Sequence, residues 1–177
     1  MRRLTGTAAP AIALLLTMTA CSDSGDDGDA GGDEPSLGSP TTSVASVDDK
    51  AEIKAAVAAY DRALVTINRE KEVTPEFTAV ATETWADRLL TTYNDNVFSK
   101  GLVMVGRWRT MVETVKVDGD TAEADVCIDG NQVYVVEDGE SVGSGAQSQG
   151  RFPGSISLVR DSGGWKVDGA DSTEGSC

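Results

Sequence analysis

The chain has 177 residues and a formal net charge of −14, because 29 acidic residues outnumber 15 basic ones and histidine is absent. The length suits one domain with an apolar core, preceded by a shorter terminal segment. The absence of histidine excludes Ser-His and Cys-His nucleophile systems and metal sites built on imidazole. The acidic balance, with no basic cluster beyond Arg107 and Arg109, argues against nucleic acid as a partner.

The first 20 residues have the layout of an export signal. Arg2 and Arg3 provide positive charge, an apolar run too short to span a membrane follows, and small residues precede Cys21. Residues 18–21, MTAC, resemble a bacterial lipobox, whose cysteine is lipidated and becomes the mature N-terminus. We therefore expect residues 1–20 to be a lipoprotein signal peptide and Cys21 to anchor an exported protein at the outer, extracytoplasmic face of the cell membrane. The alternative is an ordinary cleavage site that adjoins a cysteine.

Residues 21–47 have the composition of a tether. After the cysteine they contain six acids, no bases and no aromatic residues. Such a segment does not bury enough apolar surface to offset its ordering entropy, so we expect a disordered acidic linker. Calcium binding in this stretch is the alternative, but Gly31 stands where an EF-hand loop needs its third ligand.

The remaining two cysteines, Cys127 and Cys177, belong to the domain that we expect over residues 48–177. In an exported domain an even pair is most simply a disulfide, which here would hold the C-terminus to the domain. A reactive thiol is the alternative, but it needs a base to form thiolate, and the chain has no histidine to act as one.

Apolar stripes with helical spacing predict helices in the first part of the domain. One stripe has spacings of four, three, four and three, and consists of Ile53, Val57, Tyr60, Leu64 and Ile67. Asp49 with Glu52 resembles a capping pair at its start. Thr74 followed by Pro75 predicts a short helix. Thr84 is the expected cap of a further helix, which ends before Gly101. This helix carries a second apolar stripe, which consists of Trp85, Leu89, Tyr93 and Val97.

From residue 102 the pattern changes to strands. Residues 102–117 are rich in β-branched and aromatic residues, and residues 121–128 alternate apolar with polar. Further strands are expected at residues 131–137, 155–160 and 165–170. Helices followed by hairpin-connected strands predict an α+β fold, with the helices packed on one face of a curved antiparallel sheet of about four to five strands.

Three features carry a resemblance to a known superfamily: the helix-rich start, the VDGD turn at residues 117–120, and the sequence GWKV at residues 164–167. In these the domain resembles the nuclear transport factor two-like (SnoaL-like, cystatin-like) superfamily, and more narrowly its exported bacterial lipoproteins. The resemblance covers nearly all of residues 48–177. It implies a cone-shaped fold that encloses a pocket. In different members this pocket is an active site or a ligand or partner site, so the fold does not give the function.

Aromatic residues are the candidates for lining such a pocket, because they are typical of ligand sites. The candidates are Tyr60, Trp85, Tyr93, Trp108 and Tyr134, and the alternative for each is a place in the core. In the cluster GRWRT at residues 106–110, Arg107 and Arg109 share one strand face and Trp108 lies on the other. The two arginines either form salt bridges on the acidic surface or make an anion- or partner-binding patch.

The sequence contains no catalytic motif, and we assign no catalytic residue, metal or cofactor. We expect a non-catalytic module that binds a small apolar ligand or an envelope protein. The alternative is an isomerase- or dehydratase-like enzyme, which needs a carboxylate base and a phenol. Asp125 or Asp129 has the carboxylate and one of three tyrosines the phenol, but no spacing brings them together; the tyrosines are Tyr60, Tyr93 and Tyr134.

Overall fold

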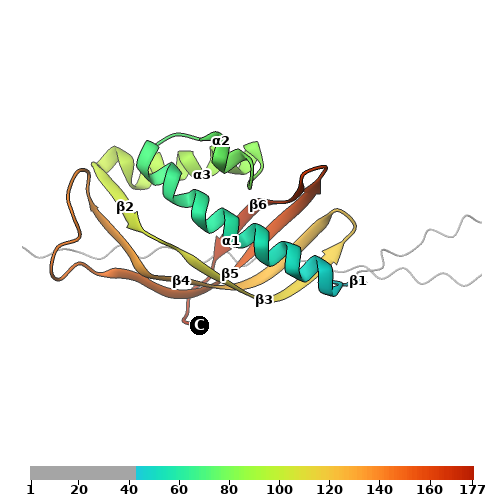
Figure 1. Ribbon diagram of the computed structural model, residues 1–177. Helices are drawn as coiled ribbons and strands as arrows, with labels where there is room; N and C mark the ends of the chain where they lie inside the picture. The colour runs from blue at the N-terminus through green and yellow to red at the C-terminus, as the bar shows by residue number, and fades with distance from the viewer. Residues whose placement is uncertain (1–42) are drawn as a thin grey trace, which may run out of the picture. The chain divides into compact units, whose positions relative to one another are not determined.

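The computed structural model describes residues 43–177. The expected signal peptide, Cys21 and most of the acidic linker lie outside these residues. In chain order the elements are β1 (Ser43–Val44), α1 (Val47–Glu70), α2 (Pro75–Thr78), α3 (Glu83–Asn96), the 3-10 helix η1 (Phe98–Lys100), β2 (Leu102–Gly106), β3 (Arg109–Asp118), β4 (Thr121–Glu137), β5 (Ser148–Asp161) and β6 (Gly164–Ser172). The predicted α+β class is confirmed, since the helices pack on one face of a curved antiparallel sheet (Figure 1).

The sheet has the strand order β1-β3-β4-β5-β6, and β4 is long enough to pair first with β3 and then with β2. The single strand predicted over residues 102–117 is therefore divided into β2 and β3. The division follows Gly106, whose φ of 114° favours glycine. A Cβ at Gly106 would lie 1.8 Å from the carbonyl oxygen of Gln132. Only a residue without a side chain fits at position 106. Arg107 and Trp108 then form the connection between β2 and β3.

The predicted apolar stripe of α1 forms the centre of the core. Ile53, Val57 and Ile67 are fully buried, in one cluster with apolar residues of the sheet. The sheet residues of this cluster include Val115, Val126, Ile156, Leu158 and Val167. Figure 1 shows α1 lying across the sheet, with α2 and α3 beside it on the same face. Burial of this stripe therefore fixes the position of α1 on the sheet.

Threonines begin the two shorter helices. The Thr74 hydroxyl accepts a hydrogen bond from the backbone N–H of Phe77, with Pro75 in the first turn, as predicted. The α3 cap is Thr82 rather than the predicted Thr84. Thr82 is favoured because it also forms hydrogen bonds to β6. Its N–H donates to the Val167 carbonyl, and its hydroxyl donates to the Asp168 carboxylate at 2.7 Å. These bonds attach the start of α3 to the last strand.

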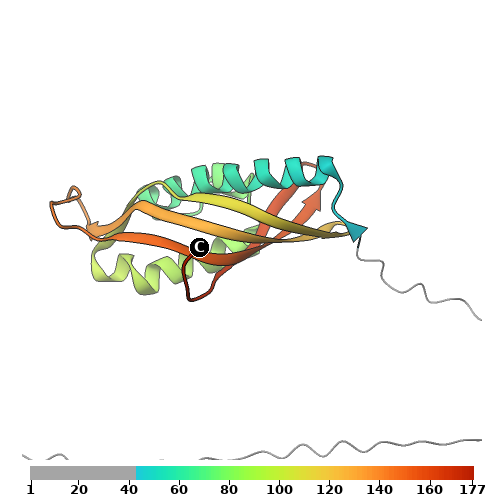
Figure 2. The same cartoon turned by 90° about the horizontal axis from the view of Figure 1, so that it is seen from below.

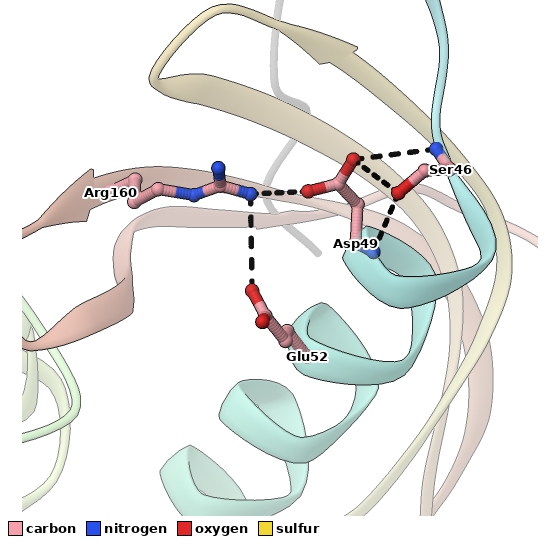
Figure 3. Close-up of polar contacts among 4 residues, drawn as sticks. All are labelled: Ser46, Asp49, Glu52 and Arg160. Carbon is pink, nitrogen blue, oxygen red and sulfur yellow. Dashed lines mark hydrogen bonds and ion pairs between the residues drawn. The ribbon is translucent and has the colours of Figure 1, made fainter.

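The start of α1 is a reciprocal cap. The N–H of Asp49 donates to the Ser46 hydroxyl at 3.0 Å, and the N–H of Ser46 donates to an Asp49 carboxylate oxygen at 3.3 Å. The cap therefore lies three residues before the predicted Asp49–Glu52 pair. The other Asp49 oxygen pairs with Arg160 of β5, which also lies 3.9 Å from Glu52 (Figure 3). The hydrogen bonds from Ser46, and then from Arg160, hold the pKa of Asp49 below its ordinary value.

The folded unit begins before residue 48. Ser43 and Val44 pair with β3, and Ala45 belongs to the core. The last residues of the expected linker are thus part of the domain. Of the helices within residues 43–177, none combines the length and apolar character that crossing a membrane requires.

The sulfur atoms of Cys127 and Cys177 lie 2.00 Å apart, as expected for the predicted disulfide. Cys127 is buried on β4, and Cys177 ends the chain. The two views place the C-terminus on the face of the sheet opposite the helices (Figure 2). The bridge therefore holds the segment after β6 against a central strand.

Replacing Asp49 by asparagine should lower the melting temperature at about pH 7, because asparagine keeps an acceptor for Ser46 but loses the ion pair with Arg160. Folding lowers the pKa of Asp49, so its contribution is complete above the pKa of an unfolded aspartate, about 4. That contribution is lost as the pH falls through the lower, folded value. We expect the difference in melting temperature between wild type and variant, followed by circular dichroism, to disappear by about pH 2.

The control is Asp48→Asn in the same helical turn, which should melt close to the wild type throughout. A difference between wild type and Asp49→Asn that is the same at both pH values would contradict this account.

Candidate functional site

A cavity of about 400 Å³ is lined by residues of α1, α3 and the sheet. It brings together four of the predicted aromatic residues: Tyr60, Trp85, Tyr93 and Trp108. The apolar part of the lining also includes Leu64, Leu89, Ile128, Phe152 and Ala170. A cavity of this size and character is in the range of small-molecule sites.

A hydrogen bond between two aromatic residues joins α1 to α3 in the wall of this cavity. The indole N–H of Trp85 donates to the Tyr60 hydroxyl at 2.9 Å. Burial raises the pKa of Tyr60, and it raises the pKa of Tyr93 to about 12. Both phenols therefore stay neutral near pH 7, so they offer hydrogen-bonding groups without charge.

Trp108 forms the wall on the sheet side, and a glycine makes room for it. Its ring contacts Phe152 edge to face, with the ring centroids 6.1 Å apart. A Cβ on Gly130 would lie 2.5 Å from a ring carbon of Trp108. Trp108 occupies this place because residue 130 has no side chain.

Asp61 is a functional candidate that the sequence analysis missed. It is 6% exposed, it lines the cavity, and both its oxygens accept hydrogen bonds from Thr110: from the N–H at 2.6 Å and from the hydroxyl at 2.8 Å. Burial raises the pKa of Asp61. The sequence did carry a signal, because Asp61 is four residues after Val57 and three before Leu64, within the apolar stripe.

A second cavity, of about 450 Å³, gathers arginines from separate elements. Arg62 of α1 joins the predicted Arg107 and Arg109, next to Trp108. The polar lining also includes Asp61, Thr110, Asp129, Asn131 and Gln132. Among residues 43–177 none of the three arginines forms an ion pair, so the structure does not contain the surface salt bridges that were one of the two expectations for Arg107 and Arg109.

The remaining predicted residues are not in the first cavity. Tyr134, on β4, lines neither cavity, and its hydroxyl donates to the carbonyl of Asn131 at 3.4 Å. Asp125 is exposed and accepts a hydrogen bond from Thr114, while Asp129 lines the second cavity. Neither Asp125 nor Asp129 lines the cavity that contains Tyr60 and Tyr93, so the carboxylate–phenol pairs considered for an enzyme do not meet there.

Comparisons with known proteins show a likeness in structure but no match in sequence. No protein-family model matches the chain, and no curated protein matches it. Among solved structures, the intermembrane space region of the chloroplast protein ARC6 has a TM-score of 0.51 and 11% identity, over 74% of this chain and 100% of that one.

Two further structures are of proteins of unknown function. Rv3472 of Mycobacterium tuberculosis has a TM-score of 0.48 and 18% identity over 71% of each chain. A protein of Nostoc punctiforme with a cystatin-like fold has a TM-score of 0.44 and 13% identity, over 72% of this chain and 91% of that one. At such identities a likeness to a solved structure concerns the fold alone.

Proposed function

We propose that the protein is an exported lipoprotein with a SnoaL-like domain, whose apolar cavity binds a small molecule without catalysis. The observation that carries the proposal is the aromatic-lined cavity between α1, α3 and the sheet. Its lining residues come from elements that the core holds in place, which favours binding because a preformed site loses little entropy when a ligand enters.

Polar groups on the cavity wall define the ligand further. Each Asp61 oxygen accepts one hydrogen bond from Thr110, and a carboxylate has about four acceptor positions. Asp61 therefore has capacity for a hydroxyl or amine of the ligand. Arg88 also lines the cavity and stacks on Trp85, with its guanidinium carbon 4.7 Å from the ring centroid. We infer a mainly apolar ligand with one or two polar groups.

A protein partner of apolar character has less support than a small molecule. The large apolar side chains that are exposed within residues 43–177 are Val47 (85%), Val135 (37%) and Val142 (45%), which come from separate segments. Scattered exposed residues of this kind are ordinary on a protein surface, whereas an apolar interface needs a continuous patch.

Two features support export and anchoring. Residues 1–20 followed by Cys21 have the layout of a lipoprotein signal, and the Cys127–Cys177 disulfide is typical of an oxidising compartment. A place at the outer face of the membrane also gives the domain access to apolar molecules.

An enzyme that uses Asp61 is the second candidate function. A buried carboxylate with a raised pKa beside a cavity is typical of general bases, and Tyr60 lines the same cavity. The two hydrogen bonds from Thr110 favour the binding module, because they already engage both carboxylate oxygens, one of which a base would use to accept a proton.

Adding a bulky side chain to the cavity lining should weaken the binding of an apolar probe. Thr92 is an exposed cavity residue on α3, so Thr92→Trp adds bulk there without disturbing the core. In a fluorescence titration with the neutral dye N-phenylnaphthylamine, we expect wild type to bind and Thr92→Trp to bind at least about tenfold more weakly, which is about 1.4 kcal/mol. Thr91→Trp, at an exposed position that does not line the cavity, is the matched control and should bind like wild type. Absence of dye binding by wild type, or equal losses in both variants, would refute the proposal.

Asp61→Asn should raise the melting temperature at about pH 7. Folding raises the pKa of Asp61, so an ionised Asp61 disfavours the folded state, and this penalty appears as the pH rises from about 4 through the folded value. Asparagine keeps partners for both Thr110 groups without the charge. In melts across this pH range the advantage of the variant should shrink as the pH falls, whereas Asp125→Asn, on the exposed side, should show no such trend. A variant less stable than wild type at about pH 7 would show that Asp61 serves stability instead.

Replacing Cys21 by serine should prevent lipidation and move the protein from the membrane fraction to the soluble fraction. Cell fractionation followed by mass spectrometry of the N-terminal peptide measures both effects. Ser22→Ala, which keeps the cysteine, is the control and should remain with the membrane. Unchanged membrane retention of Cys21→Ser would defeat the anchor assignment.

A further inference from the structure

We infer that the arginine-lined cavity is an anion-binding site, and that it holds the acidic head group, a carboxylate or phosphate, of the ligand whose apolar part occupies the first cavity. We call this second cavity, lined by Arg62, Arg107 and Arg109, the arginine cleft. The inference rests on the proposed function and names the ligand class as an anionic amphiphile.

The charge balance of the cleft favours an anion. Three arginines line it together with two aspartates, and both aspartate carboxylates already have partners. Asp61 accepts two hydrogen bonds from Thr110. Asp129 accepts one from the backbone N–H of Asn131 at 3.0 Å and lies 3.8 Å from Arg151. Within residues 43–177, none of the three arginines has a carboxylate within ion-pair distance, although the charge of Arg62 acts on the neighbouring Asp61.

Arginine side chains held by rigid elements suit recognition of an oxyanion. Guanidinium groups present planar pairs of donors that match carboxylate and phosphate oxygens. The arginines come from α1, from the β2–β3 connection and from β3, so three elements fix their backbones around the cleft. The N–H of Arg107 donates to the carbonyl of Gln132 at 3.4 Å, and the backbone of Arg109 lies opposite that of Asp129 in the pairing of β3 with β4.

The two cavities share a wall, which links the anion to the apolar ligand. Asp61, Trp108 and Thr110 line both of them. The two cavities are therefore adjacent. A ligand whose apolar part lies in the first cavity has its polar end close to the arginine cleft. The raised pKa of Asp61 reduces the repulsion that an ionised carboxylate in the wall would exert on an anionic head group.

The test compares ligands that share an apolar chain and differ in the head group. Decanoate, decyl phosphate and decanol displace N-phenylnaphthylamine from the full chain, made soluble by Cys21→Ser. We expect decanoate or decyl phosphate to displace the dye at about tenfold lower concentration than decanol at low salt, and this advantage to shrink as salt is added. Comparison of the two anions identifies the preferred head group.

Variants separate a specific site from general attraction. In Arg107→Gln/Arg109→Gln the advantage of the anion over decanol should disappear, while decanol displaces as before. The charge-matched control is Lys54→Gln/Arg69→Gln, at exposed positions on α1 that line neither cavity, and it should keep the advantage. Equal displacement by decanol and both anions, or equal losses in the two double variants, overturns the inference and leaves the proposed function in place. If the dye itself does not bind, the proposed function fails and this inference fails with it.

Discussion

The position of α1 on the concave face of the sheet is the constraint on which the rest of the structure depends. One face of this helix contributes both to the core and to the cavity lining. Ile53, Val57 and Ile67 are fully buried in the core, whereas Tyr60 and Asp61 line the cavity. Because the sheet is curved and wider than one helix, α3 covers the remaining surface, and the space between the two helices and the sheet stays open. The same packing that stabilises the domain therefore creates the site.

Polar groups in this space are arranged to limit the penalty of burial. The Trp85 indole N–H donates to the Tyr60 hydroxyl oxygen, and Thr110 provides both donors to Asp61. A buried carboxylate still opposes folding, since desolvation outweighs these bonds and raises its pKa. An apolar residue in the same stripe would avoid this penalty, so the presence of Asp61 points to use of the cavity rather than to stability.

Local patterns in the sequence predicted most of the fold. Helical spacing located α1 and α3, Thr74 with Pro75 located α2, and β-branched runs located the centres of the longer strands. The strand boundaries differ, because the two strands expected at residues 121–128 and 131–137 form the single strand β4, β5 begins at Ser148 rather than at residue 155, and β1 was not expected. Features that depend on contacts between distant segments were not predictable. The break between β2 and β3 requires the Gln132 carbonyl to approach Gly106, which only the pairing of β2 with β4 reveals.

The same distinction applies to the site. Tyr60, Trp85 and Tyr93 meet in one cavity because they lie on helix faces that local periodicity identifies. Trp108, which was expected on the strand face opposite Arg107 and Arg109, instead reaches the cavity from the β2–β3 connection and lines the second cavity with both arginines. Asp61 acquires its partner 49 residues later in the chain, and Arg62 joins Arg107 and Arg109 only in the folded domain. Tyr134, chosen for its residue type alone, lies elsewhere.

Native mass spectrometry of the full chain, purified from its natural host in mild detergent, tests the central claim most directly. The claim predicts a retained molecule of a few hundred daltons, released on collisional activation, and absent from a variant whose cavity is filled. A wild-type spectrum that contains only the mass of the protein itself would contradict the claim that the cavity holds a small-molecule ligand.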